Sequence, residues 1–222
     1  MNLNINEALR YLGVTTPADD TVLSDVTAIA DKLTACVQPR YTYRVCSLQR
    51  SGEGFLISEL DILLSGSDAA KMLEQCDQIA LLACTLGAQF DALLRAEQVR
   101  DMSRAVILDA CGSAWVEAGC DEMERELSAR LPGRYLTDRF SPGYGDLPLS
   151  LQPKICNALD TRKRLGLHVT EQFLLNPSKS VTAFIGLSNQ PQMARIRGCA
   201  YCRMHESCTL RKGGHHCAKA TV

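Results

Sequence analysis

The stretch Gln78–Leu86 reads QIALLACTL, an almost unbroken run of apolar residues. Such a run is typical of a strand with both faces buried. Gly87 then begins a helical pattern that extends to about Val99. Because 46% of the 222 residues are hydrophobic, the chain can bury a sizeable core around this strand.

Outward from this strand, helical and strand patterns alternate only imperfectly. Helices are predicted at 6–12, 19–37, 67–76, 101–131 and 152–165, and strands at 41–48, 55–57, 134–140 and 180–187. There is no GxGxxG and no GxxxxGK(S/T) sequence, so neither a dinucleotide-binding fold nor a P-loop is indicated. The body is therefore α+β or irregular α/β, with helices packed on a mixed or antiparallel sheet.

The longest helical pattern, 101–131, is unusually rich in small residues. Gly112 and Gly119 each cost about 1 kcal/mol relative to alanine inside a helix, so we expect this helix to approach a sheet closely there. A ligand-binding role for Asp109–Ala114 (DACGSA) is the alternative.

Charge and the lengths of the apolar runs limit the classes of protein. The formal net charge of −1 gives no global electrostatic argument for a nucleic-acid or membrane-surface partner. The longest apolar runs are far shorter than the roughly 20 residues that cross a bilayer, and the N-terminus lacks the regions of a signal peptide. We therefore expect a cytoplasmic protein, in which cysteines pack, bind metal or do redox chemistry rather than form disulfides.

The eleven cysteines divide into two groups. Seven are scattered through the body, where free cysteine behaves as a small hydrophobic residue, and we expect them to fill the core: Cys36, Cys46, Cys76, Cys84, Cys111, Cys120 and Cys156. The other four lie in residues 193–222, which hold six Lys and Arg and one acid. We place the boundary there, with a body at 1–190 and a basic, Cys-rich extension at 191–222.

The cysteines of the extension follow the pattern Cys199-x2-Cys202-x5-Cys208-x8-Cys217. Four thiolates complete either a tetrahedral zinc site or a 4Fe–4S cluster. In a zinc site, a thiolate could be replaced by one of three nearby histidines, His205, His215 and His216. The remaining alternative is a mobile basic tail with reactive thiols.

Residues 139–146 read RFSPGYGD and follow a predicted strand, a position where binding sites are often built. Pro142 fixes its own φ, while Gly143 permits backbone conformations closed to other residues. Arg139 offers a forked cation that suits a carboxylate, and Tyr144 offers a flat ring and a hydroxyl. Such a loop would suit an amino-acid carboxylate joined to an aromatic base. The alternative is an ordinary Pro-Gly turn with an exposed arginine.

The same loop belongs to a family resemblance. Five segments occur in the family's order: NEALRYLG, LLACTLGAQFD, DMSRAVILDACGSAWVEAGCDEMERE, YLTDRFSPGYGDLPLSLQ and NPSKSVTAFIGLS. They resemble the activation (reactivation) domain of cobalamin-dependent methionine synthase, and still more the stand-alone proteins built from that domain alone. The resemblance covers residues 1 to about 190. It implies an α+β fold around a twisted, mainly antiparallel sheet flanked by helices.

The resemblance also implies a ligand and a reaction. Arg139 would hold the carboxylate of S-adenosylmethionine, and the loop at Ser141 and Gly143 would contact its adenine and sugar. Tyr144 would lie near the methyl group and the cobalt, as the residue nearest the chemistry. In the reaction, inactive cob(II)alamin on a partner protein receives one electron and then the methyl group. The chain would thus be a component of a methionine synthase (methyltransferase) system.

The implied partners are a cobalamin-binding methionine synthase or another corrinoid protein, and a flavodoxin- or ferredoxin-type electron donor. The chain has no Asp-x-His-x-x-Gly motif for cobalamin, so the cobalamin is expected on the partner. Because the reaction needs an electron, the resemblance favours an iron–sulfur cluster over zinc in the extension. The alternative function is a metal- or Fe–S-carrying redox adaptor that docks on a B12 protein without using S-adenosylmethionine. One departure from the family is Gly133, which stands where the large enzyme has an acid.

Overall fold

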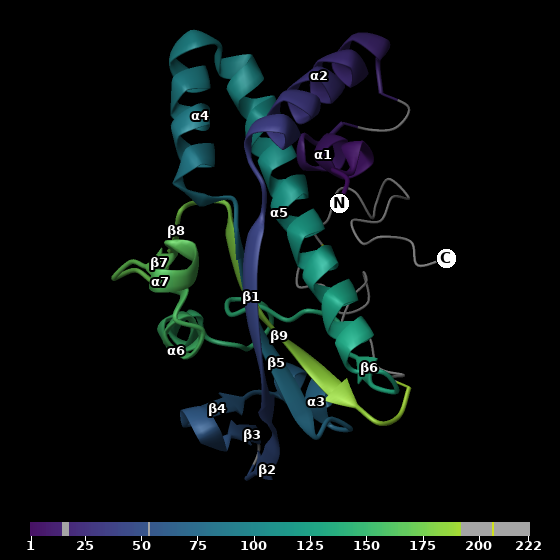
Figure 1. Ribbon diagram of the computed structural model, residues 1–222, viewed down its shortest axis with the longest axis vertical. Coiled ribbons are helices and arrows are strands. Elements are labelled where there is room, and N and C mark those ends of the chain that lie inside the picture. The colour runs from purple at the N-terminus through teal and green to yellow at the C-terminus, as the bar shows by residue number, and fades with distance from the viewer. Residues whose placement is uncertain (15–17, 53, 192–205, 207–222) are drawn as a thin grey trace. The chain divides into compact units, whose positions relative to one another are not determined.

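The computed structural model describes residues 1–14, 18–52, 54–191 and 206 (Figure 1). The chain forms two units, each assembled from separate stretches of sequence. Unit 1 comprises Met1–Arg44, Leu82–Arg130 and Gln152–Thr182. Unit 2 comprises Val45–Leu81, Leu131–Leu151 and the chain from Ala183 onward.

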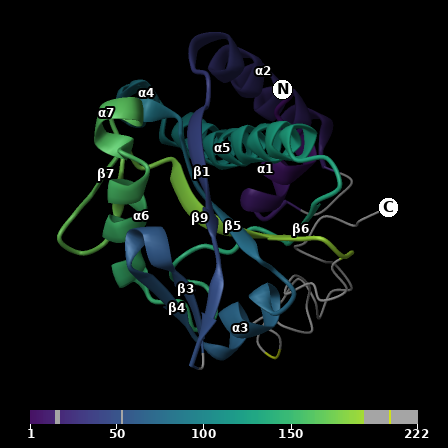
Figure 2. The same ribbon diagram turned by 60° about the horizontal axis from the view of Figure 1, so that its bottom comes forward.

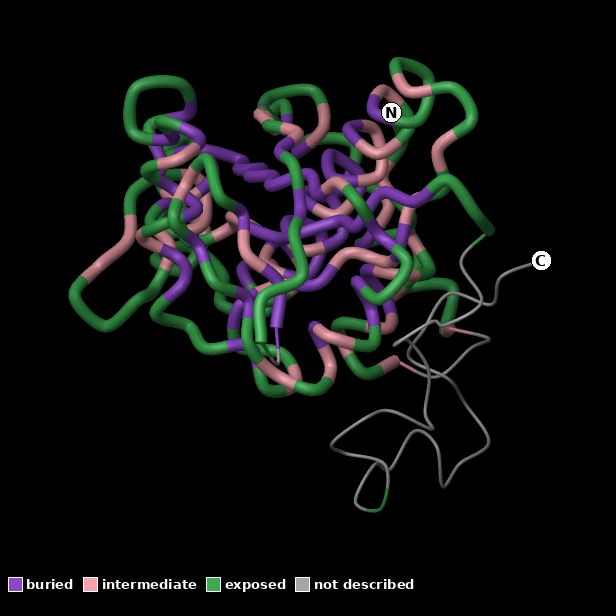
Figure 3. The backbone as a smooth tube through the Cα atoms, turned by 90° about the horizontal axis from the view of Figure 1, so that it is seen from below, coloured by how far each residue is buried: buried purple, intermediate pink, exposed green. Residues whose placement is uncertain are grey.

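The largest sheet has four strands in the order β1-β5-β9-β6. They are β1 (Arg40–Ser47), β5 (Gln78–Thr85), β9 (Ser180–Ser188) and β6 (Tyr135–Leu136). β5 is the predicted apolar strand and is buried from Ile79 to its end; buried residues are purple in Figure 3. β6 pairs with β9 in the antiparallel sense, as do the strands of the two smaller sheets, in agreement with the predicted α+β class.

Four helices of unit 1 pack together around the longest of them. They are α1 (Ile5–Tyr11), α2 (Asp20–Cys36), α4 (Gly87–Arg100) and α5 (Met102–Arg130). The other three all contact α5, as Figure 1 shows. In α2 the buried residues Val26, Ile29 and Leu33 recur at helical spacing, so one face of that helix enters the core.

α5 begins after Asp101, whose Oδ1 accepts hydrogen bonds from the backbone N–H groups of Ser103 and Arg104 at 2.9 and 3.2 Å. Side chains at its two glycines would collide with neighbours. A Cβ on Gly112 would lie 2.3 Å from the Phe90 ring of α4, and one on Gly119 would lie 2.8 Å from Cys84 Sγ of β5. The predicted close approach to a sheet is therefore confirmed at Gly119, whereas Gly112 approaches a helix. In the described part of the chain, no helix is long and apolar enough to cross a membrane.

The helix predicted at 152–165 is wrong in one respect, because it is two helices. α6 (Gln152–Ala158) ends before Asp160, and α7 (Thr161–Leu165) follows it. Asp160 has φ +50°, a left-handed conformation that interrupts a right-handed helix. The sequence also gave no prediction for the hairpin of β7 (His168–Val169) and β8 (Leu175–Asn176) that comes next.

Among its described residues, unit 2 contains a three-stranded antiparallel sheet and one α-helix (Figure 2). The strands are β2 (Gln49–Ser51), β3 (Gly54–Ile57) and β4 (Ile62–Ser65), with a short 3-10 turn, η1 (Ser58–Leu60), between the last two. α3 (Ser67–Leu73) follows β4 directly and contacts β3 and β4. The strand predicted at 55–57 lies within β3, and β4 was not predicted.

The strand predicted at 134–140 is wrong over most of its length. β6 pairs with β9, and a bridge joins Phe140 to Phe184. Between them, the Thr137 N–H still donates to the Gly186 carbonyl at 3.0 Å, but the Gly186 N–H donates to Thr137 Oγ1 at 2.8 Å. A side-chain hydroxyl thus replaces a backbone carbonyl, and the ladder is interrupted there.

The predicted packing role of the seven body cysteines is confirmed for six of them. Cys36, at the end of α2, is exposed, which corrects the prediction at that position. Burial raises the pKa of the Cys76 and Cys111 thiols to about 11, so both stay protonated at neutral pH. Protonated, buried thiols are poor nucleophiles.

Candidate functional site

The loop that carries the predicted binding motif belongs to unit 2 and runs from β6 to the 3-10 turn η2 (Leu149–Leu151). Phe140, in this loop, is fixed to β9. Its N–H donates to the Phe184 carbonyl at 2.9 Å, and its carbonyl accepts from the Phe184 N–H at 2.8 Å. Both phenylalanines are buried. The start of the loop is therefore part of the core rather than a free surface segment.

Three backbone hydrogen bonds close the loop on itself. The N–H of Tyr144 donates to the Ser141 carbonyl at 3.1 Å, and the N–H of Leu147 donates to the Tyr144 carbonyl at 3.1 Å. The N–H of Gly143 donates to the Leu147 carbonyl at 2.8 Å. The N–H groups of Gly143 and Tyr144 are thus used within the loop, so a ligand would meet side chains and carbonyl groups instead.

Two glycines make this tight turn possible. Gly143 has φ +92° and Gly145 has φ +57°, values in which glycine carries no steric penalty. A Cβ on Gly143 would lie 2.9 Å from the Leu149 side chain, and one on Gly145 would lie close to the Asp68 carboxylate. The predicted need for glycine is confirmed at Gly143, and Gly145 has the same need.

Asp146 ties the loop to α3. Its Oδ2 accepts hydrogen bonds from the backbone N–H groups of Ser67 and Asp68. The N-cap residue of α3 is Gly66, which has no side chain that could make this contact. A carboxylate at a helix N-terminus satisfies unpaired N–H groups and interacts favourably with the positive end of the helix dipole. Asp146 therefore caps a helix that lies far from it in the sequence.

The groups that the loop presents outward are few. Pro142 and Leu147 are buried, and Arg139 and Ser141 are half-buried. Gly143 is exposed, and the Tyr144 side chain is 70% exposed. An exposed aromatic ring on a closed turn can stack against a planar ligand, and the backbone of the turn is already ordered before binding. The four predicted residues Arg139, Ser141, Gly143 and Tyr144 all lie on this loop, and their binding role stays a prediction.

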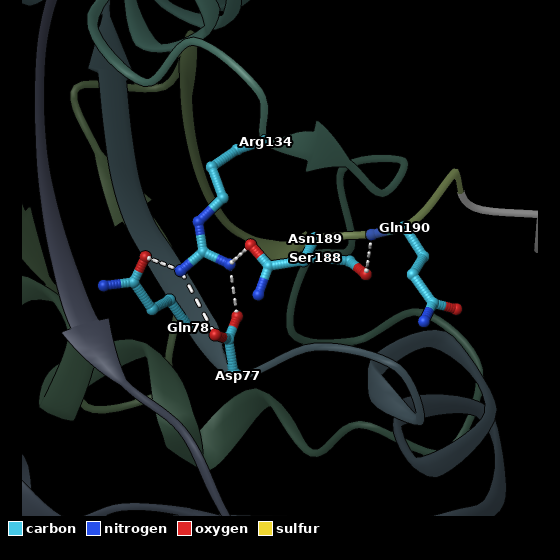
Figure 4. Close-up of polar contacts among 6 residues, drawn as sticks. All are labelled: Asp77, Gln78, Arg134, Ser188, Asn189 and Gln190. Atoms are coloured by element: carbon cyan, nitrogen blue, oxygen red, sulfur yellow. Dashed lines mark hydrogen bonds and ion pairs between the residues drawn. The ribbon is translucent and has the colours of Figure 1, made fainter.

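A second arginine, Arg134, forms a polar cluster in the same unit (Figure 4). It donates to both carboxylate oxygens of Asp77 at 2.7 and 3.2 Å, to Gln78 Oε1 at 2.6 Å and to Asn189 Oδ1 at 2.7 Å. These contacts join the start of β5 to the end of β9. Sequence reasoning missed this cluster, because its members are distant in the chain and no local pattern connects them.

The predicted metal ligands Cys199, Cys202, Cys208 and Cys217 lie outside the described residues, as do His205, His215 and His216. The metal site and the boundary near 190 therefore stay predictions from the sequence. Within the described residues, no group of three or more His, Cys, Asp or Glu side chains is arranged to hold a metal ion.

Comparisons with known proteins agree with this fold. No family model matches the sequence, and no curated protein matches it. Among solved structures, the chain is similar to the MetH reactivation domain bound to AdoHcy, with a TM-score of 0.66 and 16% identity. The match covers 97% of this chain and 84% of the other. The chain shares the fold of the MetH reactivation domain. At this level of identity the comparison establishes the fold alone.

Proposed function

We propose that the protein binds S-adenosylmethionine at the loop 139–144 and supports reductive methylation of cob(II)alamin on a partner protein. One observation supports this above the others. The motif Arg-Phe-Ser-Pro-Gly-Tyr lies on a closed turn with its tyrosine exposed, in a chain that shares the fold of a domain solved with AdoHcy. AdoHcy is S-adenosylmethionine without its transferable methyl group.

The residues of the loop suit the parts of this ligand. The Arg139 guanidinium can bind the methionine carboxylate through two parallel hydrogen bonds. Gly143 is exposed, and its carbonyl can accept from the adenine amino group or a ribose hydroxyl. The Tyr144 ring can cover the sulfonium and its methyl group, because a cation is attracted to the face of an aromatic ring.

The proposed reaction needs positioning rather than acid or base catalysis. One electron from an external donor reduces cob(II)alamin to cob(I)alamin, whose electron pair forms the new bond to the methyl carbon. The S–CH3 bond breaks, and its electron pair stays on sulfur as AdoHcy leaves. No proton moves. The contribution of the loop is to hold the methyl group in line with the cobalt of the partner, and a pre-closed turn lowers the entropy cost of doing so.

Calorimetric titration with S-adenosylmethionine tests the proposal. Arg139→Ala should weaken binding by about 1.5–3 kcal/mol, or roughly 10- to 150-fold, if the guanidinium holds a carboxylate. Arg95→Ala removes an exposed arginine of α4 and should leave the affinity unchanged. The proposal fails if the folded protein does not bind S-adenosylmethionine, either alone or with a corrinoid protein present. An unchanged affinity in Arg139→Ala would refute the role of that residue.

A further inference from the structure

Unit 1 contains a groove far along the chain from the loop 139–148. It follows the face of α5 that is left open by α1 and α4, which lie on opposite sides of α5 in Figure 1. The walls include Tyr11, Leu94, Met102 and Val106, and the groove has a volume of about 330 Å³. Met102 is 61% exposed and Val106 is 53% exposed. Large apolar side chains are thus left in contact with water inside a concave surface.

A charged pair adjoins these apolar walls. Asp109 and Ser113 of α5 line the groove, and Lys179, which is not one of the lining residues, contacts both. Lys179 Nζ donates to Asp109 Oδ2 at 2.8 Å and to Ser113 Oγ at 2.9 Å. Ser113 Oγ in turn donates to the Asp109 backbone carbonyl at 3.2 Å. The segment Asp109–Ala114, for which the sequence suggests a ligand-binding role, supplies both partners of the lysine.

Each charge of the pair has capacity left over. An ammonium group has three N–H donors, and the described residues accept two of those of Lys179. Asp109 Oδ1 accepts no hydrogen bond from a described residue, and the Asp109 side chain is 50% exposed. The Lys179 side chain is only 16% exposed, so its third donor has little access to bulk water. One donor and one acceptor of opposite charge therefore remain side by side.

The pair is not required to anchor the segment that carries Lys179. The neighbouring Ser178 donates from its hydroxyl to Asp91 Oδ1 at 2.6 Å. The Lys179 backbone carbonyl accepts from the Leu86 N–H at 2.9 Å, and Ser180 Oγ donates to Thr85 Oγ1 at 2.7 Å. These contacts hold the backbone around Lys179 without using its side chain.

We infer that this groove binds an α-amino acid with an apolar side chain. A simple anion would be attracted by Lys179 and repelled by Asp109, and a simple cation would meet the reverse. A zwitterion satisfies both, with its carboxylate on the third Lys179 donor and its ammonium on Asp109 Oδ1. Its side chain would then cover the exposed faces of Met102 and Val106. This inference does not depend on the function proposed for the loop 139–144.

Calorimetric titration of the full chain with four compounds tests the inference. L-Leucine and L-methionine carry both charges, L-leucinamide lacks the carboxylate, and N-acetyl-L-leucine lacks the ammonium. We expect both amino acids to bind and each modified compound to bind at least about tenfold more weakly, because each leaves one partly buried charge without its partner. The inference is overturned if neither amino acid binds, or if the modified compounds bind as tightly as leucine.

Variants assign each charge to its residue. Lys179→Met should abolish the preference for leucine over leucinamide, and Asp109→Asn should abolish its preference over N-acetyl-leucine. Because removing one partner can destabilise the fold, the double variant Asp109→Asn/Lys179→Met, which removes both charges, is measured alongside and should not bind leucine although it is folded. Controls are Asp31→Asn and Lys32→Met, two exposed residues of α2, which should bind normally.

The two proposed sites are separated by crossing their variants. Arg139→Ala should leave leucine binding unchanged, and the double variant at 109 and 179 should leave S-adenosylmethionine binding unchanged. Leucine binding that is lost in Arg139→Ala but kept in the double variant would place the amino acid on the other site and overturn the inference.

Discussion

Unit 2 contains two neighbouring polar regions of different construction, the cluster around Arg134 and the loop 139–148. Around Arg134, side chains contact one another, the arginine donates to Asp77, Gln78 and Asn189, and its side chain is only 18% exposed. In the loop 139–148, the backbone contacts itself and Tyr144 remains 70% exposed. The hydrogen-bonding groups of the Arg134 cluster therefore join segments of the fold.

The difference shows how a fold can separate stability from binding. The Arg134 guanidinium directs both of its terminal nitrogens to acceptors of the fold, so it cannot present its two-nitrogen fork to a ligand. A turn that is closed by backbone hydrogen bonds keeps its shape whatever its exposed side chains do. We therefore expect substitutions at the Arg134 cluster to act on stability, and substitutions at the tip of the loop to act on binding.

Arg134→Met should have the largest effect on stability. It leaves Asp77 and Asn189 without their partner and should lower the free energy of unfolding by about 2–3 kcal/mol, a value kept moderate because Asp77 is 55% exposed. Urea unfolding followed by circular dichroism measures it. Arg95→Met, on the exposed face of α4, should change stability by less than about 0.5 kcal/mol. Equal effects of the two substitutions would show that the Arg134 cluster is not structural.

Gly145→Ala should come next. Its φ of +57° is matched by Gly52, which has the same φ but no atom within 4 Å of an added Cβ. Gly52→Ala should therefore cost about 1 kcal/mol for the backbone conformation alone. Gly145→Ala should cost about 1 kcal/mol more, because the new Cβ must displace the Asp68 carboxylate. The difference between the two variants in urea unfolding isolates the packing of the loop against α3, and no difference would contradict that packing.

Asp146→Ala removes the cap of α3 and should cost about 1 kcal/mol of unfolding free energy. Asp146→Asn keeps an acceptor oxygen but loses the charge that favours a helix N-terminus, so it should cost less than the alanine variant. Thermal unfolding of the two variants beside the parent protein measures the order. If alanine and asparagine were equally harmful, the carboxylate would not act as a cap.

Tyr144→Ala should have the smallest effect on stability, below about 0.5 kcal/mol, because the ring is mostly in solvent. If the proposed function is right, the same change should weaken S-adenosylmethionine binding by about 1 kcal/mol. Tyr135→Ala, an exposed tyrosine on β6, is the matched control for titration. If Tyr144→Ala lowered stability but left S-adenosylmethionine binding unchanged, the loop would serve stability rather than binding, contrary to the expected distinction.

Sequence reasoning succeeded where a local pattern determines the structure. The predicted helix at 19–37 became α2 (Asp20–Cys36), and the predicted strand at 78–86 became β5 (Gln78–Thr85), because periodicity and continuous hydrophobicity are read within a short window. The turn character of Gly143 followed from its residue type in the same way.

It failed where a distant residue or an unusual backbone angle decides. Asp160 adopts a left-handed conformation. An aspartate in the sequence does not by itself indicate that conformation, so α6 and α7 were predicted as one helix. Asp146 caps a helix that begins at Ser67, and a cap is normally sought next to its helix. The exposure of Cys36 at the end of α2 depends on which neighbours cover that turn, which periodicity does not specify.

The contact between Asp146 and α3 also has a consequence for the order of folding. The residues that it joins are 79 positions apart in the chain, and closing a loop of that length costs conformational entropy before the contact stabilises anything. Contacts of such long range slow folding and tend to form late. The loop 139–148 should thus reach its final shape among the last events of folding. A ligand that binds this loop would therefore bind only molecules that have finished folding.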